Sequence, residues 1–460
     1  MIIDQSPLDF EVQRVIQSDF IPNFHRYQGQ FKINDKVIDV IKIMAIDDEA
    51  DYELTYGSVR MVRVIMPLGD YSVEIFPNLD NMEFILKTEM TNPNTLESTG
   101  EEGSIMVETF NVSPNPETRP YMSEDNGSEV TSKEVQNLVS LIEVDIQLKP
   151  KLLDDISKVS IGGHFFDTTN AQCLIDLITF HCAQLDLEDD QKLIGVNLVG
   201  TASEIVKKSI QIGHGLPLSD LADFLQKKSG GVFPSGMAQF VHERIWYVYP
   251  PYDTTGFDEA KEKLVIVSVP AKRYPQLNKT YLTENGITTI LSTGSKRITT
   301  NKQQVRDNAG NGTMFMDASK VISGFGVEKG NQAVIKRSEN NNEYLGETIE
   351  NGKNNVRMSE ERITDNPFLS RSRLSRGQGH WYTVEWENAD PGIIKPGMCV
   401  KILYMNEGEV CEITGVLNKV HRHTRLNGKG LMAVGHRTNV VMMIFVKSSP
   451  GENSGTLGLE

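Results

Sequence analysis

The chain has 460 residues, of which 39% are hydrophobic, so it is long enough for three or four domains with cores of their own. It carries 62 acidic and 46 basic side chains, which gives a net charge of −16. All of the excess lies in residues 1–160, which hold 29 acidic and 13 basic side chains. Because contacts with nucleic-acid phosphates need Lys and Arg, this charge disfavours direct nucleic-acid binding by the first third and indicates an acidic, solvated surface there.

The sequence predicts a folded, soluble protein made in a reducing compartment. No stretch approaches the roughly 18 consecutive apolar residues that a membrane-spanning helix needs. Met1–Phe10 lacks a charged segment followed by an apolar core, so we expect neither export by a signal peptide nor membrane insertion. The four cysteines show no CxxC spacing, and we expect them to be reduced, structural thiols: Cys173, Cys182, Cys399 and Cys411.

Residues 1–158 are expected to form a β-barrel. Apolar runs and apolar–polar alternation recur along this segment, which is typical of strands with one buried face. The clearest stretches are Val37–Ile46, Val59–Met66, Tyr71–Ile75, Met82–Lys87 and Ile142–Leu148. Residues 91–125 are rich in Pro, Asn, Glu, Ser and Gly, so we expect a long exposed loop inserted into this barrel, from Thr91 to Asp125.

Residues 159–235 are expected to be a helical segment. Thr168-Thr169-Asn170 provides a cap for a helix over Ala171–Ala183, in which apolar residues fall at helical spacing. A second helix is expected over Pro217–Lys228, because it begins with Pro in its first turn and stops at Gly230-Gly231.

Residues 236–327 are expected to form a strand-rich domain packed on these helices. Strands are predicted over Phe240–Tyr249 and Lys263–Val269. The aromatic cluster of Trp246, Tyr247 and Tyr249 is typical of a strand core. The same rings on a surface would instead stack on bases or sugars, so both interpretations stay open at this point.

Residues 328–378, rich in Asn and Gly, are expected to be a loop or linker, and residues 448–460 a flexible tail. Arg371, Arg373 and Arg376 form a short basic patch at the end of that linker. This patch is interpreted either as a solvated linker or as a contact surface for an acidic partner.

Residues 379–447 contain the densest strand and turn signals in the chain. Tyr382, Val384 and Trp386 alternate with polar residues, and turns follow at Asp390-Pro391-Gly392 and Pro396-Gly397. The run Asn439–Val446 is apolar on both faces, so both faces need to be covered. We expect four or more antiparallel strands here, closed or nearly closed into a C-terminal β-barrel. The predicted fold class is therefore α+β and β-rich, with two antiparallel β-barrels plus a helix-and-strand domain.

The order of these closing signals resembles a known family. Ile394–Val400 has the pattern Ile-Lys-Pro-Gly-Met-x-Val, a later strand runs from Gly415 to His421, and Gly435-His436 leads into the last hydrophobic strand. This order is similar to the closing barrel of the central baseplate hub proteins of contractile bacteriophage tails. Those proteins are related to the upper part of the type VI secretion spike. The resemblance covers residues 379–447 and extends to the middle of the chain only in the order of helices and aromatic strands.

The resemblance implies a structural virion protein rather than an enzyme. It implies that both barrels are tail-tube-like and that three chains form a trimeric, pseudo-sixfold ring, which joins the tail tube to the central spike and leaves a channel for DNA. The implied partners are tail-tube proteins, the central spike and other baseplate proteins, and DNA would pass without specific binding. The implied location is the tail baseplate of the virion, after assembly in the host cytoplasm.

No motif in the sequence has catalytic or phosphate-binding spacing, so no catalytic, cofactor-binding or metal residue and no cofactor is assigned. His421-Arg422-His423 would place two imidazoles on one strand face, with His436 as a third candidate metal ligand. No Cys or carboxylate lies at ligand spacing beside them, and strand histidines near turns are commonly surface residues. Two other functions stay open: another tail-tube-end or baseplate ring protein, and a carbohydrate-binding module that uses the aromatic strands.

Overall fold

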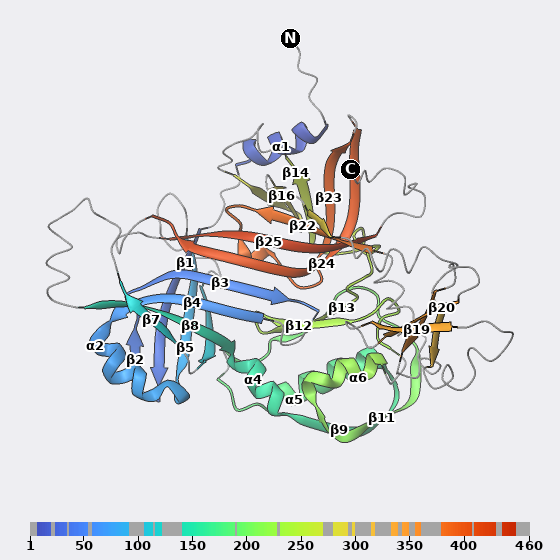
Figure 1. The fold of residues 1–460 in the computed structure, drawn as a ribbon, viewed down its shortest axis with the longest axis horizontal. Helices are drawn as coiled ribbons and strands as arrows, with labels where there is room; N and C mark the ends of the chain where they lie inside the picture. The colour runs from blue at the N-terminus through green and yellow to red at the C-terminus, as the bar shows by residue number, and fades with distance from the viewer. Residues whose placement is uncertain are drawn as a thin grey trace, which may run out of the picture.

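The computed structural model of the protein has a β-rich α+β fold with one large sheet at its centre (Figure 1). Among the residues it describes, no helix is both long enough and apolar enough to cross a lipid bilayer. The structure describes residues 7–19, 24–34, 36–53, 58–91, 105–113, 116–121, 140–188, 191–227, 231–269, 279–292, 297–299, 314–317, 333–338, 343–348, 355–359, 379–406, 409–428 and 435–447.

The first third is built mainly from strands, as the alternation of apolar and polar residues predicted. It contains α1 (Pro7–Gln17), β1 (Phe24–Ile33), β2 (Lys36–Asp39), β3 (Lys42–Asp51), β4 (Ser58–Pro67), β5 (Glu83–Thr91), β6 (Ile105–Val112), β7 (Glu117–Pro120) and β8 (Leu141–Pro150). Phe31, Val64, Phe84 and Val144 come from four of these strands, are fully buried and pack into one core. Every second side chain thus points inward, which is the arrangement of a half-buried sheet.

Two stretches of the first third differ from the prediction. Tyr71–Ile75, predicted as a strand, is the helical element η1 (Tyr71–Ile75), which lies between α2 (Leu68–Asp70) and η2 (Phe76–Asn81). Tyr71 and Ile75 are buried and four positions apart, a spacing that fits one face of a helix as well as one face of a strand. The prediction of one long loop from Thr91 to Asp125 is wrong where the chain forms β6 and β7. Most of the other residues in that range lie outside the described part of the chain.

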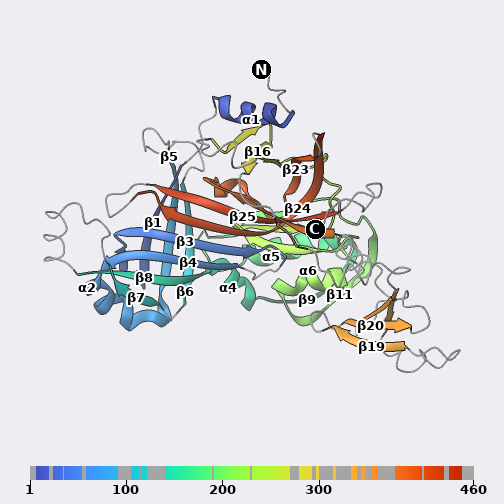
Figure 2. The same ribbon diagram turned by 45° about the horizontal axis from the view of Figure 1, so that its top comes forward.

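The last strands complete the sheet that the first strands begin. β24 (Glu409–Leu426) pairs with β3, and β25 (His436–Lys447) pairs with β24 and meets β1 where His436 stands opposite His25. The pairings therefore run in a circuit through β24, β3, β4, β8, β6, β5, β1 and β25 and back to β24. Figures 1 and 2 show the red C-terminal strands lying beside the blue N-terminal ones.

The same two strands, β24 and β25, also belong to a second group of strands. β22 (Gly379–Trp386) pairs with β25 and β23 (Cys399–Asn406) with β24, while the group is extended by β14 (Lys263–Ser268), β15 (Tyr281–Glu284), β16 (Ile287–Ser292) and β17 (Arg297–Thr299). Trp386, Val440, Met442 and Ile444 lie in the core of this group. Of the predicted run Asn439–Val446, Asn439 is exposed, and every apolar residue from Val440 to Val446 is buried or half-buried, so both faces of its apolar part are covered.

One strand of the second group contradicts the prediction of a purely antiparallel barrel. β14 runs parallel to both of its neighbours, β16 and β23. The antiparallel hairpin of β15 and β16 reverses the chain once more, so β16 returns beside β14 in the parallel direction. The strands are thus recruited from the middle of the chain as well as from residues 379–447.

The helical segment and the strands after it share a separate core. They comprise α4 (Lys151–Lys158), β9 (Ser160–Thr169), α5 (Asn170–Ala183), β10 (Gly195–Leu198), β11 (Val206–Pro217), η3 (Leu218–Asp220), α6 (Leu221–Lys227), β12 (Ala238–His242) and β13 (Ile245–Tyr249). The predicted cap is present, because the Thr169 side chain accepts a hydrogen bond from Gln172 N at 3.1 Å. β9 and β11 were not predicted and form a two-stranded antiparallel sheet.

The stretch that was predicted to be a loop or linker, residues 328–378, contains three short strands. These are β19 (Ala333–Ser338), β20 (Glu343–Thr348) and β21 (Asn355–Ser359), which join β18 (Met314–Asp317) in a four-stranded sheet. Figure 2 shows β19 and β20 at the lower right, apart from the large sheet. The division of the chain into domains at residues 158, 235, 327, 378 and 447 stays a prediction.

The cysteines are free thiols, as predicted. Cys173, Cys182 and Cys399 are buried, and Cys411 is half-buried. Burial raises the pKa of Cys173 to about 11 and that of Cys182 to about 12. These thiols therefore stay protonated and behave as small apolar core residues.

Gly397, in the Pro-Gly turn, lies against the fully buried ring of Tyr249. Its φ is 71°, and a Cβ at this position would lie 2.3 Å from Tyr249 Cγ. Because the substitution combines backbone strain with a steric clash, Gly397→Ala is expected to lower the free energy of unfolding by about 2 kcal/mol. Gly69→Ala is the matched control, since no atom lies within 4 Å of the added methyl group and its effect should be near zero. Urea unfolding of both variants measures the difference, and equal effects would contradict the prediction.

Candidate functional site

The first and last segments of the chain meet where β24 lies against β3, an arrangement that we call the seam. In this antiparallel pairing Arg422 stands opposite Asp48, and His423 stands opposite Asp47. Successive side chains on a strand point to opposite faces. Arg422 and Asp48 therefore face inward, whereas Asp47, His421 and His423 face outward.

A buried ion network occupies the inner face of the seam. Arg422 Nη1 donates to Asp48 Oδ2 at 3.1 Å, and Arg422 Nη2 donates to Tyr52 Oη at 2.7 Å. Arg60, on β4, donates to the same Asp48 oxygen at 3.3 Å and to Glu108 Oε2 at 3.1 Å. The side chains of Asp48 and Arg422 are only 8% and 7% exposed. One buried carboxylate thus binds two guanidinium groups from different strands.

The charges in this network stabilise one another. Burial raises the pKa of Asp48, but the guanidinium groups of Arg60 and Arg422 outweigh burial and lower the pKa from 3.8 to about 2. Burial lowers the pKa of Arg422, but Tyr52 and Asp48 outweigh that effect and raise it. Both groups are therefore charged at neutral pH, and removing one of them would leave the other buried without compensation.

The hairpin of β12 and β13 adds further ionisable groups beside this network. Its turn residues Glu243 and Arg244 have φ of 49° and 61°, which non-glycine residues adopt only rarely. Burial raises the pKa of Glu243, and burial together with Arg422 lowers the pKa of His242 to about 3. Two cavities of about 70 and 170 Å³ lie here and share as lining Asp48, Arg60, Glu108, His242, Glu243 and Arg422. The arrangement joins the first strands, the hairpin and the last strands through buried charge.

A second buried polar network joins β1 to the closing strands. Asp390 Oδ1 lies 2.9 Å from His25 Nε2 and accepts a hydrogen bond from Gly392 N at 3.1 Å. Asp390 Oδ2 accepts a hydrogen bond from Tyr281 Oη at 3.1 Å. Burial raises the pKa of Asp390, but the hydrogen bond and charge of His25 outweigh burial and lower it. The predicted turn at Asp390-Pro391-Gly392 therefore also holds three distant parts of the chain together.

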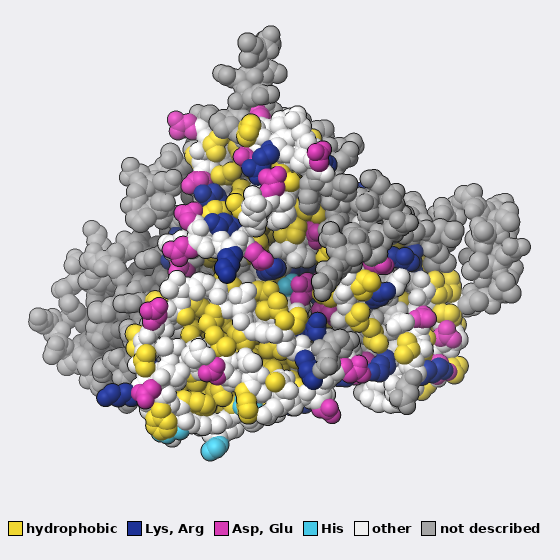
Figure 3. Space-filling model, turned by 180° about the vertical axis from the view of Figure 1, so that it is seen from behind, with side chains coloured by type: hydrophobic (Ala, Val, Ile, Leu, Met, Phe, Trp, Pro, Cys, Tyr) yellow, Lys and Arg dark blue, Asp and Glu magenta, His cyan; other side chains and the backbone are white. Residues whose placement is uncertain are grey.

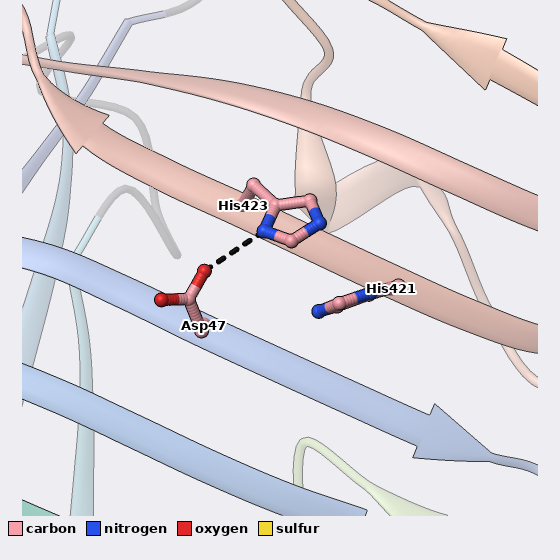
Figure 4. A group of neighbouring side chains, drawn as sticks. All are labelled: Asp47, His421 and His423. Carbon is pink, nitrogen blue, oxygen red and sulfur yellow. Dashed lines mark hydrogen bonds and ion pairs between the residues drawn. The ribbon is translucent and has the colours of Figure 1, made fainter.

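The outer face of the seam carries the histidines that the sequence singled out. The ring centroids of His421 and His423 are 3.8 Å apart, and His423 Nδ1 lies 2.8 Å from Asp47 Oδ1 (Figure 4). His436, the third predicted candidate, is buried on β25, where its Nε2 lies 2.9 Å from the carbonyl oxygen of Ile43. The structure therefore brings His421 and His423 together with Asp47 and places His436 in a different environment.

The aromatic cluster predicted as either core or stacking surface is core. Trp246 and Tyr249 are 0% exposed, and Tyr247 is 3% exposed. The indole Nε1 of Trp246 donates to Gln239 Oε1 at 3.2 Å, inside the protein. The interpretation of these three rings as a surface that binds bases or sugars is therefore wrong. The basic patch at residues 371–376 lies outside the described residues.

The sequence reasoning missed the buried ion network, although one signal pointed to it. Because side chains alternate along a strand, His421 and His423 on the outer face require Arg422 to lie on the inner face, which is the core side. A buried arginine requires a carboxylate partner. The partner, Asp48, lies 374 positions away along the chain, so no local spacing identifies it.

Large apolar side chains are exposed on the unit that contains α5, β9 and β11. Five of them are more than half exposed: Phe166, Phe180, Ile194, Ile205 and Val206. Figure 3, seen from behind, shows hydrophobic side chains gathered toward the lower left, where this unit lies after the half turn.

No protein-family model matches the sequence, and no curated protein matches it. Among solved structures, the chain is similar to the 43 kDa tail protein of prophage MuSo2 from Shewanella oneidensis, with 12% identity over 91% of this chain and 98% of that chain and a TM-score of 0.45. It is similar to an Escherichia coli component of the type VI secretion system, with 7% identity, 91% and 77% coverage and a TM-score of 0.36. It is also similar to a PdpA–VgrG complex, with 10% identity, 93% and 66% coverage and a TM-score of 0.40.

Proposed function

We propose that the chain is a structural baseplate hub of a contractile tail, three copies of which form a pseudo-sixfold ring between the tail tube and the central spike. The observation that carries this proposal is the sharing of β24 and β25 by two groups of strands. One group is the circuit with the first strands, and the other contains β22, β23, β14 and β16. Each chain therefore contributes two barrel-like units, and three chains contribute the six units that a pseudo-sixfold ring requires.

The junction between these two units is suited to a ring that bears mechanical load. Residues 419–425 of β24 pair with β3 on one side and with β25 on the other, and residues 409–416 pair with β23. The buried ion network lies directly under this strand, and the Asp390 network joins β1 to the closing strands. Because both units share continuous strands, neither can rotate without breaking backbone hydrogen bonds. A tail tube and a spike attached to such a ring would keep a fixed orientation.

The outer face of β24, β3, β4, β8 and β7 is the surface that we propose for the channel. Its basic side chains are paired with carboxylates: Arg63 Nε lies 2.7 Å from Asp145, Arg119 Nε lies 2.5 Å from Glu143, and Arg425 lies 2.9 Å from Asp47. Cations that are already paired contribute little to phosphate binding. DNA would therefore pass this surface without specific binding, as the acidic first third also favours.

The exposed apolar side chains of the α5, β9 and β11 unit suggest where neighbouring proteins attach. Phe166 and Val206 are 64% and 62% exposed, and the register of β9 and β11 places them on opposite faces of the two-stranded sheet. Burying such side chains contributes about 25 cal/mol for each Å² of apolar surface removed from water. We assign this unit to contacts with the tail tube, the spike or other baseplate proteins, at the tail baseplate of a virion assembled in the host cytoplasm.

The molar mass in solution tests the proposal. Light scattering coupled to size-exclusion chromatography, over a range of protein concentrations and at two salt levels, is expected to give three times the chain mass of 51.5 kDa. Electron microscopy of that peak should show a ring with a central channel. A hexamer would instead favour the alternative function, a ring at the end of the tail tube. A monomer at every concentration, including in the presence of spike protein, would contradict the hub proposal.

A further inference from the structure

The outer face of the seam presents three metal-ligating side chains to one point. His421 and His423 project from β24, and Asp47 projects from β3 beside them (Figure 4). One ligand atom from each of the three lies within 4.8 Å of the others, and they are the only such group among the residues that the structure describes. In Figure 4 a nitrogen of His421 faces the gap between Asp47 and His423.

The residue types are those that divalent transition metal ions prefer. Imidazole nitrogen binds Zn²⁺, Cu²⁺, Ni²⁺ and Fe²⁺, and a carboxylate oxygen completes a common three-ligand set with two histidines. His423 and Asp47 are 38% and 36% exposed, so water has access to the remaining coordination positions. A site of this kind keeps an open position, as sites with three protein ligands do.

The three side chains offer lone pairs on imidazole nitrogens and carboxylate oxygens, which are the donors that such an ion takes. Glu49 stands opposite His421 and is exposed, and it adds negative charge beside the group.

Arg425 and His423 already hold Asp47 in place. Arg425 Nη2 lies 2.9 Å from Asp47 Oδ1 and 3.0 Å from Asp47 Oδ2. These contacts fix the orientation of the carboxylate before an ion arrives, which lowers the ordering cost of binding. They also compete with the ion for the same oxygens, so the site is expected to bind less tightly than a closed structural zinc site.

We propose that Asp47, His421 and His423 bind one divalent transition metal ion, Zn²⁺ being the test case, on the outer face of the seam. The ion would link β3 to β24 across the pairing that completes the strand circuit. Metal binding would then add to the stability of the folded chain, because an ion that binds only the folded state shifts the unfolding equilibrium.

The test uses the full chain, freed of metal by dialysis against a chelator and then titrated with Zn²⁺ against a chromogenic chelator. We expect one equivalent of Zn²⁺ per chain and a rise in the melting temperature of about 2 °C or more at saturation. His423→Ala and His421→Ala should each lose the equivalent and the thermal shift. His164→Ala is the matched control, since His164 is an exposed strand histidine on β9 and its loss should change neither.

Cobalt substitution reads out the ligands directly, even if a variant is slightly less stable. Co²⁺ added to the metal-free chain should give visible ligand-field absorption that is absent in a folded His423→Gln variant, with folding checked by circular dichroism. The proposal is overturned if the unmodified chain binds no Zn²⁺ at micromolar concentrations. It is also overturned if the seam variants bind as much metal as the His164→Ala control.

Discussion

Replacing Asp48 with Asn is expected to lower the free energy of unfolding by about 3–5 kcal/mol, the cost of leaving buried charges without their partner. The substitution keeps the shape of the side chain but removes the negative charge that lies between Arg60 and Arg422. The guanidinium of Arg422 is almost fully buried and cannot turn toward water. Equilibrium denaturation by urea, followed by tryptophan fluorescence and circular dichroism, measures the change.

Asp47→Asn provides the control for this prediction. Asp47 is the next residue of the same strand, but it faces outward and is about one-third exposed, so its ion pairs contribute less than about 1 kcal/mol. The effect of Asp48 should also depend on pH. Because the pKa of Asp48 in the folded state, about 2, lies below the usual 3.8, its stabilisation is complete above about pH 5 and is lost as the pH falls through 2. A difference between the two variants of less than about 1 kcal/mol at pH 7 would refute the assigned role.

Replacing Asp390 with Ala is expected to lower the free energy of unfolding by about 3 kcal/mol, since each buried group that loses its acceptor costs about 1–3 kcal/mol. The change removes the acceptor of Tyr281 Oη and Gly392 N and the partner of His25 Nε2. Because these groups come from distant parts of the chain, the loss should loosen β1 from the closing strands. Hydrogen exchange followed by mass spectrometry is expected to show faster exchange over residues 24–33 and 279–292.

Asp253→Ala is the matched control for Asp390→Ala. Asp253 makes the same kind of turn, accepting hydrogen bonds from Thr255 N at 3.1 Å and Thr255 Oγ1 at 2.6 Å, but at an exposed position. Its loss should cost about 1 kcal/mol, the usual cost of a local cap, with no change in exchange at β1. If the two variants behave alike, Asp390 acts only as a turn residue.

The sequence predicted those helices and strands whose signal lies in their own residues, such as an apolar–polar alternation or a helix cap. The alternation around Phe84 predicted β5, and the cap at Thr169 predicted the start of α5. β1 was missed because Gln28, Gly29 and Gln30 interrupt its apolar pattern. The structure explains the glycine, since a Cβ at Gly29 would lie 2.4 Å from Phe84 Cζ on the paired strand. That requirement comes from a partner strand and leaves no local trace.

The two histidines of the candidate metal group could be predicted from the sequence, but its carboxylate could not, because that residue comes from a partner strand. Two histidines at alternate positions of one strand share a face, so His421 and His423 were expected to lie together. Asp47 supplies the carboxylate that no nearby sequence position offered, because β3 is paired with β24 only in the folded chain. His436 was proposed as a third candidate because facing strands could bring it beside the other two histidines. The register of β25 instead turns it toward the interior, where the Ile43 carbonyl accepts its hydrogen bond.

The strand circuit also sets the order in which a subunit can be completed during synthesis. β1 and β3 leave the ribosome long before β24 and β25 do. Until then, the edges of β1 and β3 that pair with β25 and β24 in the folded chain stay unpaired. Open edges of this kind pair wrongly with other chains, and contacts between distant segments form slowly. A chain interrupted anywhere before β24 cannot close the circuit and exposes those edges to degradation. Only chains that carry both sides of the seam can complete the strand circuit.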